Sequence, residues 1–266
     1  DTAANDQFGF KDDASNTVAD NDLDYQYDVN GNMTSDTNKN ITNITYNHLN
    51  LPTSIDIDSG NIGYIYDADG LKIQKTVSTN NIVTDYANGY VYENGQLQFF
   101  DHPEGYVSPD NIGGYDYVYQ YVDHLGNIRL SFAEDSNGQS SVTIVEEDNY
   151  YPFGLKQRGY NNGGDTSLGN DVAQRWKYNG KEYDESLGLE TYDFGARNYN
   201  PDLGRWMNID PLAEEMTRHS PYNYAFNNPL RFIDPDGMSP DDIIIKGDKK
   251  FKQAALAHLQ GLTNDK

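Results

Sequence analysis

Two aspartates that each precede a proline are the residues best placed to do chemistry in this sequence. Asp210 stands before Pro211, and Asp234 stands before Pro235. Two carboxylates close enough to share a proton have split pKa values, which gives one general base and one general acid. Such a pair could activate water to hydrolyse an amide, and a scissile bond in the same chain needs no association step. Paired-carboxylate chemistry is therefore one kind of reaction that these residue types could perform.

Both aspartates also have ordinary structural explanations. Asp210, Pro211 and residues 212–216 are typical of a helix N-cap followed by proline at the first helical position. Asp234 opens the sequence Asp-Pro-Asp-Gly, which is common in turns. Ser239 is a further candidate, as the nucleophile of an acyl shift, but a lone serine before a proline is usually a turn residue. The residues alone leave these alternatives open.

Metal, thiol and cofactor chemistry have little support in the sequence. The five histidines lack the spacing of a zinc enzyme. Residues 28–32 and 67–70 resemble the opening of a calcium loop, but neither is followed by the glutamate that such a loop needs at its twelfth position. The chain has no cysteine, so it has neither disulfides nor thiolate chemistry. No metal or cofactor is expected.

The composition favours strands and turns and disfavours nucleic-acid binding. There are 22 tyrosines and 24 glycines, and the net charge is -23. So acidic a body is poorly suited to gripping phosphate backbones. The sequence holds no apolar run of the roughly 20 residues that a membrane helix needs, and it begins without a signal segment. We expect it to be part of a longer chain.

A repeat of about 20 residues predicts a series of β-hairpins. Similar segments begin at Tyr27, Tyr46 and Tyr66, and looser copies begin at Tyr92 and Tyr121. In each copy an alternating run of apolar and polar residues turns on Asx or Gly and then resumes. Because one such hairpin cannot bury its own face, the hairpins are expected to stack edge to edge into one extended sheet.

Changes of composition divide the chain into three expected regions. Residues 1–112 hold the repeats, and residues 113–238 are denser and less regular. Residues 239–266 hold none of the 22 tyrosines, so Met238 is the clearest boundary. A short strand at Ile243–Ile245 and one helix after Asp248 are predicted for this tail.

Several longer motifs resemble the Rhs/YD-repeat family, which includes bacterial polymorphic toxins, the C component of insecticidal toxin complexes and the teneurin shells of animals. The motifs are YVDHLGNIR at 121–129, YDFGARNYNP at 192–201 and GRWMNIDP at 204–211, followed by YNYAFNNPL at 222–230 and DPDGM at 234–238. Together they are similar to the Rhs-associated core, except that Met238 replaces the usual leucine. The resemblance covers residues 25–238.

The resemblance implies a mainly β fold with specific site residues. YD-repeat hairpins would form part of a spiral β-sheet shell, closed by an Rhs core plug and followed by a short α/β tail. Self-cleaving members act as single-turnover aspartyl-type proteases, and the matching cut falls between Met238 and Ser239. Asp210 and Asp234 match the catalytic pair, and Arg205 matches a neighbour that would orient it.

The function implied is that of a bacterial toxin shell, secreted or displayed at the cell surface. The shell would enclose its own C-terminal effector and free it by self-cleavage, and an immunity protein and a secretion machinery would be further partners. One alternative is a non-cleaving adhesin or carbohydrate-binding shell, favoured by the many tyrosines. A glycoside hydrolase is a third, but no catalytic pair is recognisable outside the turn motifs.

Overall fold

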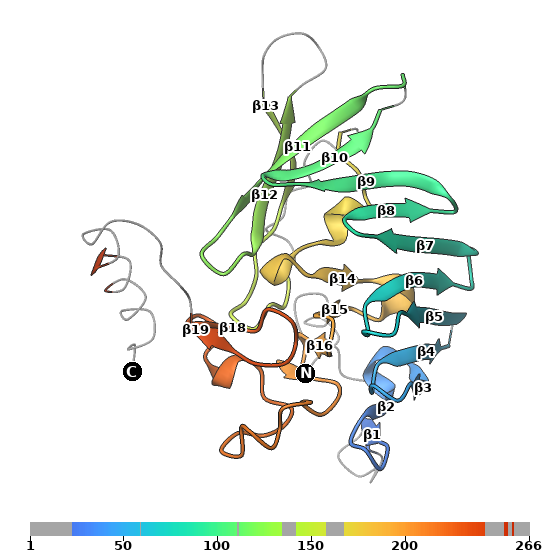
Figure 1. Cartoon of the computed structure of the whole chain (residues 1–266), viewed down its shortest axis with the longest axis vertical. Helices are drawn as coiled ribbons and strands as arrows, with labels where there is room; N and C mark the ends of the chain where they lie inside the picture. The colour runs from blue at the N-terminus through green and yellow to red at the C-terminus, as the bar shows by residue number, and fades with distance from the viewer. Residues whose placement is uncertain are drawn as a thin grey trace, which may run out of the picture.

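A computed structural model describes residues 23–58, 60–110, 112–134, 142–157 and 168–242, together with Gln253, Ala254 and Ala257. The fold is mainly β, as predicted, and its largest element is one antiparallel sheet whose strands follow chain order (Figure 1). This sheet does not close into a barrel within the described residues. Its strands are β1 (Tyr25–Tyr27), β2 (Met33–Asp36), β3 (Ile41–Tyr46), β4 (Pro52–Ile57), β5 (Gly60–Tyr66), β6 (Lys72–Val77), β7 (Ile82–Ala87), β8 (Tyr90–Glu93), β9 (Gln96–His102), β10 (Gly105–Pro109), β11 (Tyr115–Val122), β12 (Ile128–Glu134) and β13 (Val142–Glu147).

Residues 168–238, here called the closing region, pack against one face of this sheet (Figure 1). Four short strands form a second antiparallel sheet, and β18 pairs with β19. The strands are β14 (Glu182–Asp184), β15 (Thr191–Asp193), β16 (Asn198–Asn200), β17 (Arg205–Trp206), β18 (Phe232–Ile233) and β19 (Asp241–Asp242). The short 3-10 helices are η1 (Thr37–Lys39), η2 (Ala173–Arg175), η3 (Tyr178–Gly180), η4 (Ser186–Gly188) and η5 (Ala225–Asn227).

The repeated Asx residue closes each hairpin loop through its side chain. Asp67 Oδ1 accepts hydrogen bonds from the backbone N–H groups of Asp69 and Leu71, both at 2.9 Å. Asp28, Asn47 and Asp123 make the same pair of bonds to the second and fourth residues after them. This Asx turn explains why the motif recurs. In the two segments that resemble the opening of a calcium loop, the Asp28 and Asp67 carboxylates therefore already accept hydrogen bonds from backbone amides.

The repeated tyrosines join consecutive repeats. The Tyr46 hydroxyl donates to the Met33 carbonyl at 2.6 Å, and the Tyr66 hydroxyl donates to the Pro52 carbonyl at 2.9 Å. Each ring packs against the hydrophobic core of the sheet while its hydroxyl finds a backbone acceptor one repeat earlier. A tyrosine therefore supplies both apolar area and a hydrogen bond between neighbouring hairpins.

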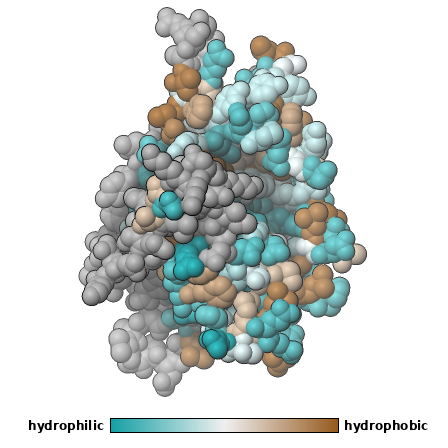
Figure 2. Space-filling view, turned by 60° about the vertical axis from the view of Figure 1, so that its left-hand side comes forward, coloured by the Kyte–Doolittle hydropathy of each residue, from teal (hydrophilic) through white to brown (hydrophobic). Residues whose placement is uncertain are grey.

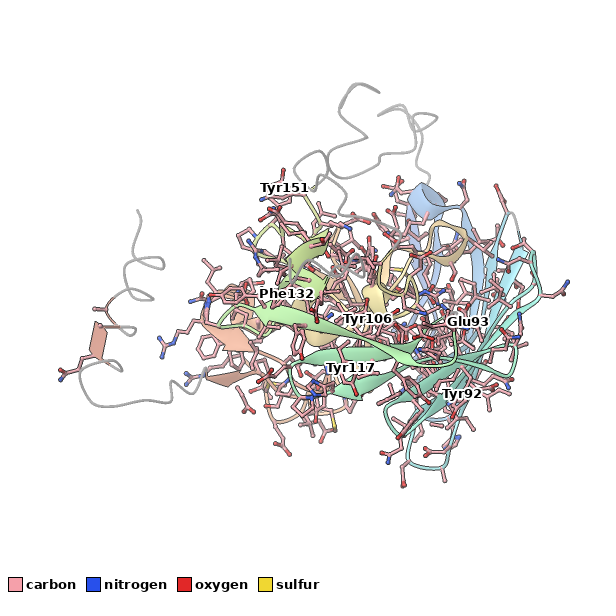
Figure 3. All side chains as sticks on the ribbon, turned by 90° about the horizontal axis from the view of Figure 1, so that it is seen from above. Tyr92, Glu93, Tyr106, Tyr117, Phe132 and Tyr151 are labelled. Carbon is pink, nitrogen blue, oxygen red and sulfur yellow. The ribbon has the colours of Figure 1, made fainter. Side chains whose placement is uncertain are left out.

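The large sheet extends beyond the expected limit at residue 112. Strands β11, β12 and β13 continue the antiparallel pairing as far as Glu147. Val118 faces the core, whereas alternate residues of the same strand form an exposed row on the opposite face: Tyr115, Tyr117, Tyr119 and Tyr121. Figure 3 labels Tyr117 on this outer face and Tyr106 on the side of the closing region. The boundary at 113 thus falls inside a sheet whose alternation persists after the repeat spacing is lost.

Buried ion pairs link the sheet to the closing region. Lys72 Nζ lies 2.7 Å from Glu182 and 2.6 Å from Asp193, and Lys75 Nζ lies 3.1 Å from Asp184. Sheet tyrosines add hydrogen bonds to the same acids, from Tyr64 to Asp184 and from Tyr86 to Glu182. Further ion pairs between the sheet and the closing region join Lys39 to Asp202, Glu93 to Arg175, and Lys177 to Glu146 and Asp148.

Exposed hydrophobic side chains are scattered on the visible face of the molecule. In Figure 2 the brown side chains are separated by teal or pale ones over most of the coloured surface that this view shows. Among the described residues no helix is long and apolar enough to span a membrane. The tail predictions at Ile243–Ile245 and after Asp248 lie outside the described residues, apart from Gln253, Ala254 and Ala257, which are helical.

Asp36 gives the junction of sheet and closing region a pH dependence. Burial raises the pKa of this carboxyl to about 6, against the opposing effect of Lys39. Because the folded protein binds this proton more tightly than the unfolded chain, the raised pKa favours folding at low pH. This stabilisation is fully present below the unfolded pKa of about 3.9 and is lost as the pH rises through the folded pKa. At each pH the free energy of unfolding of Asp36→Asn is compared with that of wild type. We expect the variant's advantage over wild type to be about 2 kcal/mol larger at pH 7.5 than at pH 4.

Urea unfolding at the two pH values measures this effect. The asparagine side chain of the variant can still accept the hydrogen bond that the Asn38 amide donates to Asp36, so the cap of η1 is retained. Asp69→Asn, in an exposed hairpin loop, makes the same change of charge and should show no such difference between the two pH values. An equal effect of Asp36→Asn at both pH values would contradict the prediction.

Candidate functional site

Asp210 begins a loop rather than a helix. Its backbone N–H donates to the Pro221 carbonyl at 3.1 Å, which closes the loop, and residues 211–215 form consecutive turns. The predicted helix at this position is wrong, because the closed loop replaces it. The capping interaction itself is present, since Asp210 Oδ1 accepts from the Leu212 N–H at 2.7 Å. The carboxylate is almost fully buried.

Asp234 follows β18 and organises the turn that leads to the predicted cut. Its Oδ1 accepts hydrogen bonds from the backbone N–H groups of Gly237 at 2.8 Å and Met238 at 3.1 Å. Gly237 has φ +81°, a conformation that favours glycine. Asp234 is completely buried, although Pro235 and Asp236 beside it are exposed. The turn explanation and a chemical role for Asp234 are therefore compatible.

Arg197 brings the two aspartates together. Its Nη1 lies 2.9 Å from Asp210 Oδ2 and its Nη2 lies 3.2 Å from Asp234 Oδ2. The guanidinium is fully buried and lies over the Trp206 ring, 4.2 Å from the ring centroid. Arginine suits this place because its planar fork of donors can bind two carboxylates at once. The carboxylates thus meet through a cation, where the sequence suggested a shared proton.

The same guanidinium reaches the backbone at the predicted cut. Arg197 Nε donates a short hydrogen bond to the Gly237 carbonyl, and Nη2 lies 3.4 Å from the Met238 carbonyl oxygen. The Met238 carbonyl belongs to the bond between Met238 and Ser239. A cationic donor beside a carbonyl oxygen stabilises the negative charge that develops there during nucleophilic attack.

Burial acts on the ionisation of Asp234 and Arg197. It raises the pKa of the Asp234 carboxyl, and the neighbouring Arg197 acts in the opposite direction. Burial lowers the pKa of the Arg197 guanidinium, against the effect of Asp210 and Asp234. A buried cation held between two carboxylates has the strong local field that catalytic centres use.

A small cavity of about 10 Å³ adjoins Asp210. Its lining includes Asp210, Ser220 and Asn223, and Pro240 from the far side of the predicted cut. A cavity of this size can hold about one water molecule where polar groups are within reach. Its lining thus includes both Asp210 and Pro240, the second residue after the predicted cut.

The remaining predicted site residues differ in their exposure and in their partners. Arg205 is exposed on β17, and the ion pairs of Asp210 and Asp234 go to Arg197 instead. Ser239 is exposed and Met238 is half-buried. Arg197 was not singled out in the sequence analysis. The available signal was its place within the motif at 192–201, directly before the buried strand β16.

Comparison with known sequences finds relatives of much greater length. No protein-family model matches the chain. Toxin subunit YenC2 of Yersinia entomophaga is 34% identical over 140 residues, which is 53% of this chain and 12% of YenC2. The tRNA nuclease WapA of Bacillus subtilis is 30% identical over 231 residues, covering 82% of this chain and 9% of the nuclease. Salivary gland surface protein 1 of Aedes aegypti is 29% identical over 216 residues, covering 81% of this chain and 5% of that protein.

Solved structures share the fold. The crystal structure of TcdB2-TccC3 superposes with a TM-score of 0.59 at 22% identity, over 80% of this chain and 11% of that one. The Photorhabdus luminescens Tc holotoxin pore gives a TM-score of 0.54 at 20% identity, over 85% of this chain and 13% of that one. The fold is therefore that of a toxin-complex β-shell. Together with the sequence relatives, it supports a relation to Rhs/YD-repeat proteins such as toxin-complex subunits.

Proposed function

We propose that this chain is the closing end of a toxin shell that cuts its own backbone between Met238 and Ser239. The cut frees a C-terminal effector that the shell encloses. The protein is secreted from a bacterium, and an immunity protein protects the producing cell. The observation that carries the proposal is the position of Arg197, which contacts Asp210, Asp234 and the Met238 carbonyl oxygen.

In the proposed reaction each group has a role. Asp210 takes a proton from a water in the adjoining cavity, and the water oxygen bonds to the Met238 carbonyl carbon. Arg197 stabilises the negative charge on the Met238 oxygen. The bond to the Ser239 nitrogen then breaks, and Asp210 returns the proton to that nitrogen. Asp234 holds the Gly237 and Met238 amides and keeps Arg197 in place.

Intact mass of the purified chain at neutral pH tests the proposal. The wild-type chain is expected to split after Met238, whereas Asp210→Asn and Asp234→Asn remain whole, because one variant lacks the base and the other lacks the ion pair that positions Arg197. Asp69→Asn, in an exposed loop, should split like wild type. The new termini are sequenced, since acid-labile Asp-Pro bonds would instead give fragments that end at Asp210 or Asp234. A folded wild-type chain that stays whole would overturn the proposal.

A second candidate function is a binding shell that does not cleave. It is favoured by the exposed tyrosine row on β11, because such rings stack well on the apolar faces of sugars. The Tyr119 ring also stacks on the Phe132 ring of the neighbouring strand β12, with 5.8 Å between ring centroids. This candidate requires that the Met238–Ser239 bond remain intact, so the mass measurement separates the two functions.

A further inference from the structure

The residues just downstream of the predicted cut are docked on the closing region. Pro240 is half-buried beside Asp210. Pro240 lines the small cavity beside Asp210 together with Ala213, Met216, His219 and Phe226, and this set is here called the Pro240 pocket. Three of these come from the loop that Asp210 opens, and Phe226 comes from η5. The loop that supplies the proposed base and the second residue after the cut therefore line the same cavity.

The next two residues extend a β-ladder. In β19, Asp241 lies opposite Ile233 and Asp242 lies opposite Phe232, in antiparallel register with β18. Strand addition of this kind uses backbone hydrogen bonds, so it holds an extended segment with little demand on its side chains. Because β18 directly precedes Asp234, the pairing ties the downstream segment to the element that carries a proposed site residue.

Phe226 makes the pocket and the ladder one packed unit. Its ring meets Phe232 of β18 edge to face, with 5.1 Å between centroids, and lies 4.7 Å from the His219 ring. Phe232 is the residue opposite Asp242. A change in the pocket is therefore transmitted to the strand pair through a single aromatic contact.

The scissile bond lies between two fixed points. Upstream, the Met238 N–H is held by Asp234 and by Asp236. Downstream, Pro240 is half-buried and the next two residues pair with β18, whereas Ser239 between the two fixed points is exposed. A proline restricts the residue before it to extended conformations, so Pro240 also limits the backbone of Ser239. Fixing both ends of a reacting bond keeps it in the geometry needed for attack.

We propose that Ser239–Asp242 is the recognition segment of the self-cleavage, with Pro240 as its main determinant. The inference rests on the proposed function and deepens it. The preferred substrate is an extended segment with proline at the second position after the cut. The specificity of the reaction thus lies partly in the first residues of the released fragment.

Cleavage during cell-free synthesis of the full chain tests this inference, with intact mass followed over time. Pro240→Ala and Phe226→Ala are each expected to slow the cut by about tenfold or more, since small misplacements of a reacting bond have effects of this size. The double variant should be little slower than the singles, because both changes act on the same cavity. Ser239→Ala, at the exposed position between the anchors, should cut within about twofold of wild type, since its hydroxyl has no part in positioning the bond.

The outcomes separate this inference from the proposed function. If wild type and Pro240→Ala cut equally fast, the recognition segment is refuted while the self-cleavage stands. If wild type does not cut, both fall. Hydrogen exchange on folded Asp210→Asn, which keeps the bond intact, then measures the docking itself. Protected amides at Asp241 and Asp242 should exchange faster when Pro240→Ala is added, and equal exchange would contradict the docking.

Discussion

Replacing Arg197 by lysine is expected to reduce the proposed self-cleavage by at least about a hundredfold, the usual cost of losing a donor to a developing oxyanion. Lysine keeps the charge but has one ammonium group in place of a planar fork. It cannot reach Asp210, Asp234 and the Met238 carbonyl at the same time, as the guanidinium does. The stacking on Trp206 is lost as well.

Arg205→Lys is the matched control, and it separates the two arginines that the motifs contain. Arg205 is exposed, so this variant should cut like wild type. The rate is followed by intact mass during cell-free synthesis, and near-UV circular dichroism reports whether each variant is folded. A folded Arg197→Lys chain that cuts at the wild-type rate, or an Arg205→Lys chain that does not cut, would refute the role assigned to Arg197.

The largest expected loss of stability follows from removing Lys75. We expect Lys75→Met to lower the free energy of unfolding by about 3–5 kcal/mol, as is typical when one partner of a buried pair is left alone. Lys75 is 1% exposed and pairs with Asp184, which also accepts from Tyr64. Without Lys75, the Asp184 carboxylate stays buried with much less compensation.

Two further measurements test the ionic explanation of this loss. Burial alone would raise the pKa of Asp184, but Lys75, Ser186 and Lys72 hold it well below its ordinary value. The stability from this carboxylate is therefore present above its unfolded pKa of about 3.9 and is lost as the pH falls toward the folded value. Urea unfolding should show a smaller acid-induced loss in Lys75→Met than in wild type. The double variant with Asp184→Asn should recover part of the stability, and additive losses would contradict the pairing.

The hairpin fold was predictable because its determinants are local. An Asx residue that binds the amides two and four positions ahead forms its turn wherever the motif occurs, as Asp67 and Asp123 do. The limit of the sheet was less predictable. Beyond residue 112 the spacing of repeats becomes irregular, but the alternation at Tyr115–Val122 still builds a strand. Strand formation depends on alternation and partner strands, not on the length of the repeat.

The sequence pointed to the two acids and the bond of the candidate site, but it did not point to Arg197. Asp210, Asp234 and Met238 stand in recognisable motifs, whereas Arg197 is one of several arginines in the same region. Only the turn between β15 and β16 brings its side chain between the two acids. The expected helix after Pro211 failed for a similar reason, because the bond from the Asp210 N–H to the Pro221 carbonyl is a long-range contact that helix propensity does not include.

The tyrosine bonds between repeats give the shell a direction of assembly. Each hydroxyl donates to a carbonyl that was synthesised earlier, from Tyr46 to Met33 and from Tyr66 to Pro52. A hairpin leaving the ribosome therefore finds its acceptor already in place on the preceding hairpin. Folding can follow translation one unit at a time, so the closing region, which follows the large sheet in the chain, meets a sheet that is already formed.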